Sequence, residues 1–326
     1  ARIEASKVFS KDLMKKYGIP TAKYETFDDP EKVMDYIKAE GKYPVVIKAD
    51  GLALGKGVLI CQNEQEAADG VKEIMLDKKF GASGNHVVVE EFLTGPEVSV
   101  LSFCDGKTVK PMVSSMDHKR ALDHDEGLNT GGMGTVAPNP YYTPAVAERC
   151  MQEIFLPTVA AMQAEGCPFK GCLYFGLMLT PDGPKVIEYN CRFGDPETQV
   201  VLPLLESDLL TVMEATTNGT LDKTDVKFSD GAAACVILAS GGYPLAYEKG
   251  KEITGLTAGQ LDVADVTVYH AGTAIKDGSL VTNGGRVLGV TATANTLPEA
   301  LKKAYAATES IHFDKLHKRS DIGARA

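Results

Sequence analysis

The stretch KVIEYNCRFGDPETQ, from Lys185 to Gln199, gathers more polar side chains than a buried strand would need. Glu188 and Asn190 lie two residues apart on an expected strand, so their side chains point to the same face. Two hard oxygen ligands beside the cationic Arg192 suit Mg²⁺ held against nucleotide phosphates, because this ion prefers carboxylate and phosphate oxygens. The alternative is a solvated strand face that carries an ion pair. The spacing favours a metal site and leaves that alternative open.

A second candidate is the glycine-rich segment GLALGKGV, which begins at Gly51 and follows the strand that ends near Lys48. Glycines let backbone N–H groups approach phosphate oxygens, and Lys48 and Lys56 would add positive charge. The segment is no P-loop, because G-x-x-x-x-G-K-[ST] is absent, and no G-x-G-x-x-G opens a helix here. It therefore resembles a phosphate cradle, and a hairpin tip without a ligand is the alternative.

A third candidate combines SMDHKR, which ends at Arg120, with NTGGMG, which begins at Asn129. Both lie in a long region without helical or strand periodicity, and such regions inside compact domains often carry function. The charged loop could hold an anionic or carboxylate-bearing substrate. A solvated run of charges is the alternative. No histidine pair has the H-x-x-x-H spacing of many zinc sites, and no G-x-S-x-G supports a serine nucleophile.

Length and charge limit the class of protein. A chain of 326 residues predicts two or three compact units. The net charge of -10 argues against non-specific binding to nucleic acid or to an anionic membrane. The longest apolar run, residues 232–239, is too short to span a bilayer. We therefore expect small-molecule partners, with no nucleic acid and no membrane.

Cysteine usage indicates a compartment. Seven scattered cysteines form no C-x-x-C pair. Reduced thiols and a cytoplasmic location are expected. The chain opens ARIEASK without a methionine, which suggests a processed product or a segment of a longer, even multifunctional, protein.

Helical and strand patterns alternate along the first two thirds of the chain, and short strands dominate afterwards. DDPEKVMDYIKAEG predicts one of the helices, with Asp28 or Asp29 as its cap, Pro30 in its first turn and Gly41 at its end. We place a domain boundary near Val226, with one domain over residues 1–225 and a β-rich domain over residues 226–326. The expected fold class is α+β. No motif in the second domain names a role for it.

Taken together, the motifs resemble those of an ATP-grasp ligase, and the match narrows to the glycinamide ribonucleotide synthetase family. RFGDPE and NTGGMG are the specific segments, while the lysine and glycine loop occur across ATP-grasp enzymes generally. The resemblance covers essentially the whole chain. It implies an ATP-grasp fold, with ATP between two α+β subdomains and a lid subdomain inserted at about residues 21–92.

The resemblance also implies roles for particular residues. Lys7 and Lys48 would reach ATP phosphates, Arg192 would steady the transferred phosphoryl group, and Glu188 with Asn190 would hold Mg²⁺ or Mn²⁺. Lys48 and Arg192 are thus the expected catalytic residues. The remaining nucleotide-binding residues would be Gly51, Gly55, Lys56 and Gly57 in the glycine-rich segment, Glu90, Glu91 and Leu93 at the hinge that holds adenine, and Glu97 at the ribose. The glycine and phosphoribosylamine site would comprise Asp117, Lys119, Asn129, Gly131, Gly132 and Arg192. The turn holding Asp195 and Glu197 would border its amino-acid side.

The implied reaction is ATP-dependent ligation of glycine to 5-phosphoribosylamine through a glycyl phosphate. Its products are glycinamide ribonucleotide, ADP and phosphate, in purine synthesis, and the family suggests a monomer. Two departures bear on this. Many ATP-grasp relatives carry another metal-binding carboxylate where this chain has Gly176, which favours the narrower family. Family members also begin with a glycine-rich domain of about a hundred residues, a typical domain size, that helps to build the acceptor site.

The sequence contains nothing that matches this N-terminal domain. One alternative is therefore an MgATP-binding fragment without a complete acceptor site. Another is a different ATP-grasp enzyme that joins another carboxylate and amine.

Overall fold

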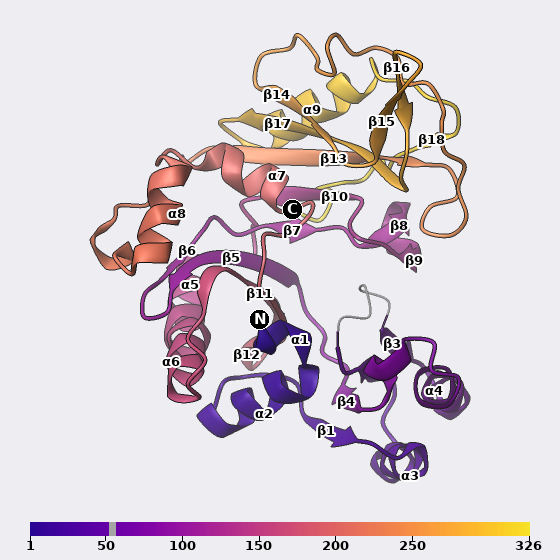
Figure 1. Cartoon of the computed structure of the whole chain (residues 1–326), viewed down its shortest axis with the longest axis vertical. Coiled ribbons are helices and arrows are strands. Elements are labelled where there is room, and N and C mark those ends of the chain that lie inside the picture. The colour runs from indigo at the N-terminus through magenta and orange to yellow at the C-terminus, as the bar shows by residue number, and fades with distance from the viewer. Residues whose placement is uncertain (52–56) are drawn as a thin grey trace.

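The computed structural model describes residues 1–51 and 57–326. The chain forms three large antiparallel sheets and two short hairpins (Figure 1). The sheet of the lid has the strand order β1-β4-β2-β3. Its strands are β1 (Tyr24–Phe27), β2 (Val45–Ala49), β3 (Val58–Cys61) and β4 (Val87–Glu91). These strands lie within the range expected for the lid, and that range stays a prediction.

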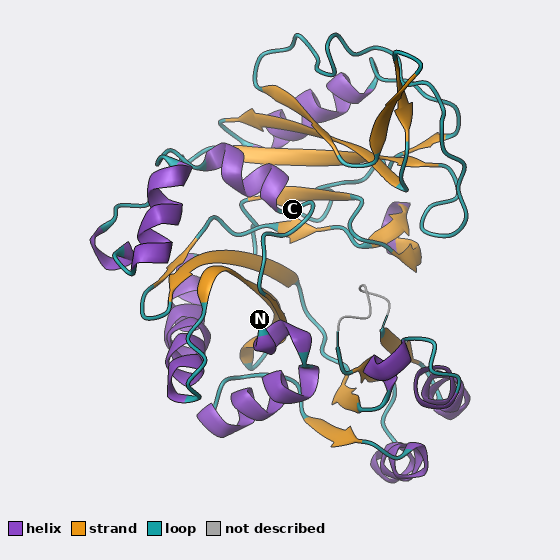
Figure 2. Cartoon of the chain, viewed as in Figure 1, coloured by secondary structure: helices purple, strands orange, loops and turns teal. Residues whose placement is uncertain are grey.

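Helices α3 (Pro30–Glu40) and α4 (Glu64–Val71) cover one face of the lid sheet, on the side away from the central sheet (Figure 2). The expected start of α3 is confirmed: the Asp29 carboxylate accepts the Glu31 backbone N–H, and Pro30 occupies the first turn. Gly41 ends the helix in the left-handed conformation. The opposite face of the sheet carries the charged Lys48 and Glu90 beside Val46 and Val88.

The central sheet has the order β12-β11-β5-β6. Its strands are β5 (Glu97–Asp105), β6 (Val109–Pro111), β11 (Lys170–Thr180) and β12 (Gly183–Asn190). One face packs against α1 (Arg2–Ala5), α2 (Lys7–Tyr17), α5 (Pro144–Cys150) and α6 (Leu156–Ala164). The other packs against α7 (Thr198–Val201), α8 (Leu209–Asn218) and the third sheet. β12, which carries the expected metal ligands, is buried against the helices through Val186 and Tyr189, and its Glu188 and Asn190 side chains are only half-buried.

The third sheet crosses the expected domain boundary near Val226. Its order is β14-β17-β13-β10-β7, and β18 also pairs with β13. The strands that precede Val226 are β7 (Met116–Asp117) and β10 (Gly134–Ala137). Those that follow it are β13 (Ala232–Ser240), β14 (Val266–His270), β17 (Arg286–Ala294) and β18 (Leu316–His317). NTGGMG therefore leads into a strand that pairs directly with β13, and the charged loop begins on β7, which pairs with β10.

Helix α9 (Leu297–Thr308) covers the far face of this third sheet. Two short hairpins complete the fold, β8 (Arg120–Leu122) with β9 (Glu126–Asn129) and β15 (Thr273–Lys276) with β16 (Ser279–Thr282). Strands β7 to β10 fall in the region that shows no periodicity, because strands of two to four residues are too short to show one. Among the described residues, no helix has the length and apolar character needed to cross a membrane.

Candidate active site

Two lysines share one buried carboxylate between the lid and α2. Lys48 Nζ on β2 lies 3.0 Å from Glu90 Oε1 on β4, and Lys11 Nζ on α2 lies 3.2 Å from Glu90 Oε2. All three residues are 5% exposed or less. Burial lowers the pKa of Lys11 to about 8, although Glu90 opposes that shift. The sequence predicted Lys48 and Glu90 but missed Lys11, which is one of several lysines on α2.

The same lysines join the lid to the central sheet. Lys48 Nζ donates to the Ile187 carbonyl at 3.1 Å, next to Glu188 in the chain. Lys11 Nζ donates to Thr21 Oγ1 at 2.7 Å, and that hydroxyl donates to the Val186 carbonyl. Both contacts reach β12, so the predicted phosphate lysine and the predicted metal strand are neighbours.

Lys7 supports the start of the glycine-rich segment. Its Nζ donates to the carbonyls of Ala49 at 3.0 Å and Gly51 at 2.7 Å, and burial lowers its pKa. Gly57 lies just before β3, and its carbonyl accepts the Ala49 N–H at 2.8 Å. The two other predicted residues of this segment, Gly55 and Lys56, lie outside the described residues.

The predicted metal ligands, Glu188 and Asn190, are half-buried near the end of β12. Within the described part of the chain, neither side chain has a hydrogen-bond or ion-pair partner, so both oxygen ligands are available. Gly176 pairs with Glu188 across the strands, and a Cβ there would lie 3.1 Å from Glu188 Cγ. The residues therefore fit a Mg²⁺ or Mn²⁺ ion that takes its other ligands from phosphate and water. The described residues hold no cluster of three His, Cys, Asp or Glu side chains that would bind a metal alone.

Residues predicted at the hinge and at the ribose contact two lysines, Lys23 and Lys119. Glu91 donates its backbone N–H to the Lys23 carbonyl and accepts the Lys23 N–H on its carboxylate, each at 2.9 Å. Leu93 is half-buried. Glu97 Oε2 lies 2.8 Å from Lys119 Nζ, and this ammonium group lowers the pKa of Glu97. The residue predicted at the ribose thus meets one predicted for the acceptor site.

A cavity of about 290 Å³ adjoins this hinge. Its lining includes Glu90, Glu91, Phe92, Tyr36 and Tyr43. Two of the residues predicted to hold adenine therefore border a space, and whether adenine occupies it stays a prediction.

Two carboxyl groups, those of Asp117 and Glu197, lie among the residues predicted for the acceptor site. Asp117 Oδ1 is shielded from solvent and lacks a hydrogen-bond partner among the described residues. Burial, together with the nearby Glu197 carboxylate, raises the pKa of Asp117 well above its ordinary value. Burial also raises the pKa of Glu197, which accepts a hydrogen bond from the Tyr174 hydroxyl at 3.1 Å. A proton is therefore more easily retained here than on an exposed carboxylate.

Gly132 is where three predicted motifs touch. Its φ is +112°, and a Cβ there would lie 2.5 Å from Pro196 Cδ and 2.6 Å from Asp117 Oδ1. Only glycine fits this conformation and this space. NTGGMG, DHKR and RFGDPE, separated in the chain, are thus brought into contact at one residue.

The remaining predicted residues, Asn129, Arg192 and Asp195, have exposed side chains. Arg192 is exposed, with Nη1 donating to the Phe193 carbonyl at 2.9 Å and Nε 3.7 Å from Glu4 Oε1. Asn129 is exposed at the end of β9. The Asp195 carboxylate accepts from Gln199 Nε2 at 2.8 Å, so it orders its own turn. Their roles toward phosphate and substrate stay predictions.

The sequence missed two residues of the C-terminal domain that hold these loops. Arg286, the first residue of β17, lies 3.1 Å from Asp195 Oδ2 through Nη2. The Tyr243 hydroxyl, in the segment after β13, accepts the Gly131 N–H at 3.0 Å. The only sequence signal is the glycine pair before Arg286, and it does not indicate a partner.

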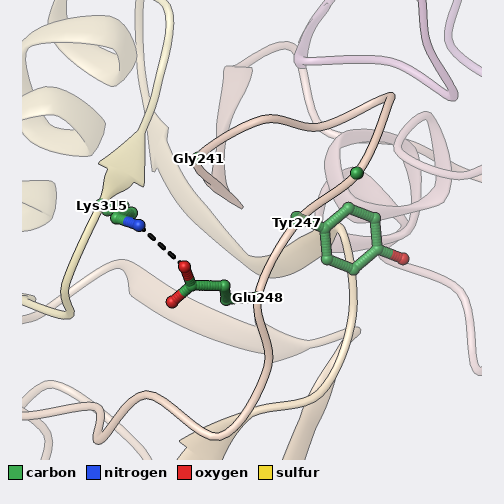
Figure 3. Close-up of a pocket in the computed structure, with 5 residues that line it drawn as sticks. Gly241, Tyr247, Glu248 and Lys315 are labelled. Atoms are coloured by element: carbon green, nitrogen blue, oxygen red, sulfur yellow. Dashed lines mark hydrogen bonds and ion pairs between the residues drawn. The ribbon is translucent and has the colours of Figure 1, made fainter.

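A separate depression of about 320 Å³ lies in the C-terminal domain and contains none of the predicted site residues (Figure 3). It is lined by Gly241, Ala246, Tyr247, Glu248 and Lys315, and Lys315 Nζ lies 2.9 Å from Glu248 Oε1. Its charged groups therefore neutralise each other.

Two family models match the chain. The phosphoribosylglycinamide synthetase ATP-grasp (A) domain covers residues 5–198, and the C domain of the same synthetase covers residues 233–325. The chain belongs to the phosphoribosylglycinamide synthetase family. The resemblance inferred from the motifs and the expected ATP-grasp fold are thereby confirmed.

Individual members of the synthetase family are similar over the whole chain. A phosphoribosylamine–glycine ligase of Vibrio vulnificus (strain YJ016) is 48% identical over 100% of this chain and 76% of its own length. A bifunctional purine biosynthetic protein of Pichia angusta is 50% identical over 100% of this chain, which spans only 41% of that protein. The crystal structure of phosphoribosylamine–glycine ligase from Thermotoga maritima superposes with a TM-score of 0.90 and 40% identity, over 98% of this chain and 79% of that one.

Proposed function

We propose that the protein carrying this chain ligates glycine to 5-phosphoribosylamine at the expense of ATP, giving glycinamide ribonucleotide, ADP and phosphate in purine synthesis. Family membership and the similarity to phosphoribosylamine–glycine ligases support the reaction. The observation that carries it is the position of Glu188 between the two halves of the site. Burial lowers the pKa of Lys7 and Glu188 opposes that shift. Glu97 and, less strongly, Glu188 raise the pKa of Lys119.

The nucleotide side would activate the carboxylate of glycine. A carboxylate is a poor electrophile, so the γ-phosphoryl group must first be transferred to it to give glycyl phosphate. Lys7, Lys48 and Arg192 would neutralise charge on the phosphates, while Glu188 and Asn190 would hold Mg²⁺ or Mn²⁺. When bound, the metal ion supplies Lewis acidity toward the phosphate oxygens.

The acceptor side would orient glycine and the amine. Lys119 would face carboxylate or phosphate charge, and Glu197 would border the glycine. Asp117 would line the site where the amine attacks glycyl phosphate, which releases a proton and then phosphate. Asn129, Gly131, Gly132 and Asp195 would shape the loops around it. Glycyl phosphate hydrolyses in water, so we expect the lid at about residues 21–92 to close during turnover.

The first experiment is ADP release by the chain with MgATP, with glycine and freshly made phosphoribosylamine supplied separately and together. Release that requires both substrates would support the ligase and show that the acceptor site is complete. Retained MgATP binding without release would favour the nucleotide-binding fragment. Release that depends on bicarbonate instead of glycine would favour another ATP-grasp ligase.

We also propose a monomer in the cytoplasm. All seven cysteines are free, as a reducing compartment requires. The printed names of relatives include bifunctional and trifunctional purine biosynthetic proteins, which is consistent with a place in a multifunctional protein. Sedimentation of the purified protein and fractionation of source cells test these two points.

A further inference from the structure

We propose that Arg286 is a positioning residue that holds the two loops of the acceptor side in register from the C-terminal domain. The inference rests on the proposed function for its kinetic consequence, while its structural basis does not. Arg286 Nη1 donates to the carbonyls of Gly131 and Asp195, each at 2.9 Å, and is 3.5 Å from the Gly132 carbonyl. Nη2 is paired with the Asp195 carboxylate. One guanidinium group therefore bridges NTGGMG and RFGDPE.

The fit of the guanidinium group depends on the absence of a side chain at Gly131. A Cβ at this residue would lie 2.9 Å from Arg286 Cζ and 3.0 Å from Nη2. The planar group can rest against the backbone only because that atom is missing. This contact gives a physical reason for the first glycine of the GG pair, separate from the reason for Gly132.

Tyr243 binds Gly131 through a second hydrogen bond. Its hydroxyl accepts the Gly131 N–H, while Arg286 donates to the Gly131 carbonyl, so both polar backbone groups of one loop residue are bound by C-terminal side chains. A hydrogen bond that involves a charged partner is stronger than a neutral one. Arg286 should therefore contribute more than Tyr243 to loop order.

Arginine suits this position better than lysine would. The guanidinium group is planar and has five N–H donors in a fixed geometry, and here it serves backbone carbonyls and a carboxylate together. An ammonium group is a point charge with a shorter reach. The side chain of Arg286 is 19% exposed, so these contacts are partly shielded from water.

The lysines that would bind nucleotide phosphates are held differently. Lys48 and Lys7 bind partners in the lid and on β12, and Arg286 is not among them. Loss of Arg286 should therefore loosen the acceptor loops and leave MgATP binding intact. This asymmetry separates a positioning role from a general structural one.

The test compares Arg286→Ala, Arg286→Lys and Tyr243→Phe with wild type in the full protein. Arg149→Gln is the matched control, because Arg149 on α5 also binds a carboxylate, that of Glu153 four residues later, at a site outside both motifs. Amide hydrogen exchange is measured for residues 129–133 and 193–197 and is compared with exchange in the lid strand β4. Kinetics report KM for the amine and for glycine, and titration reports the MgATP Kd.

In Arg286→Ala, exchange should rise in both loops and not in β4. KM for the amine or glycine should rise about tenfold or more, because a charged hydrogen-bonding group is lost, while the MgATP Kd stays within about twofold. Low, non-denaturing guanidinium should restore slow exchange, and equal ammonium should not. Arg286→Lys should retain only part of the wild-type protection from exchange. Tyr243→Phe should raise exchange less than Arg286→Ala does.

Unchanged exchange in the two loops, or an equal weakening of MgATP binding, would overturn the inference. Exchange and its guanidinium rescue need no turnover. If the wild-type protein fails to release ADP with glycine and phosphoribosylamine, the proposed function falls and exchange alone still decides the role of Arg286.

Discussion

Near Lys48 the charged side chains belong to strands and helices. Near Gly132 they belong mainly to loops that are bound by residues of the C-terminal domain. Lys48 and Glu90 occupy adjacent strands of one small sheet, and Glu188 extends from a strand beside them. Gly132, by contrast, lies against Asp117 and Pro196, and Arg286 donates to the carbonyl of its neighbour Gly131. Both sides join segments more than a hundred residues apart, but the predicted nucleotide side does so through regular strands, whereas the predicted acceptor side consists of loops that depend on a side chain of the C-terminal domain.

Glu188→Gln should give the largest effect and tests the nucleotide side directly. The neutral amide binds a divalent ion poorly, so metal-dependent turnover should fall about a hundredfold or more. Folding stability should change by less than about 0.5 kcal/mol, since Glu188 has no ion-pair partner among the described residues. Steady-state kinetics across Mg²⁺ concentrations measure this, with Glu214→Gln on α8 as the control. Unchanged activity at saturating Mg²⁺ would remove Glu188 from the metal site.

Lys11→Met should destabilise the junction of α2 and the lid. It leaves the buried Glu90 carboxylate with one ammonium partner instead of two, at a cost of about 2–3 kcal/mol. Urea denaturation measures the loss, and the exposed Lys32→Met is the matched control. Adding Glu90→Gln should cancel part of the loss because the unpaired charge is removed. Strict additivity of the two changes would show that Lys11 and Glu90 do not interact.

Gly132→Ala should act on the acceptor side alone. A methyl group there would meet Pro196 and Asp117, so the amine kcat/KM should fall about tenfold or more while the MgATP Kd is retained. Gly106→Ala is the control, because Gly106 also has a positive φ, +95°, but its nearest neighbour would lie 3.5 Å away. Equal losses in the two variants would mean that backbone strain, and not the contact between motifs, matters.

His118 tests the link to the C-terminal tail through the pH dependence of stability. Its Nε2 accepts the Gly323 N–H at 3.0 Å, and Nδ1 lies 3.2 Å from the Gly134 carbonyl. Burial, then the nearby charges of Arg319 and Arg325, lowers its pKa to about 4. Between that value and the ordinary value of 6.5, the unfolded chain binds more protons than the folded one.

Stability should therefore be complete above pH 6.5 and fall as the pH drops toward about 4, by roughly 1–3 kcal/mol. Denaturation midpoints measured across this range give the slope, and His118→Gln should flatten it. An identical pH profile in the variant would show that another group controls acid sensitivity.

Local signals predicted the features that depend on near neighbours in the chain. Asp29, Pro30 and Gly41 bound α3 because capping is an interaction within one turn. Glu188 and Asn190 share a face because strand side chains alternate. The ATP-grasp fold was expected from the resemblance of the motifs to a known family, whereas strands β7 to β10 were too short to be recognised.

The sequence by itself determined which side chains could bind metal and phosphate, and which family the chain belongs to. Only the tertiary structure decided that Lys11 shares Glu90 with Lys48, that one sheet joins strands on both sides of Val226, and that Arg286 reaches Gly131 and Asp195. The physical reason is range. Caps and strand alternation act over a few residues, but a contact between distant segments exists only after packing has fixed both backbones.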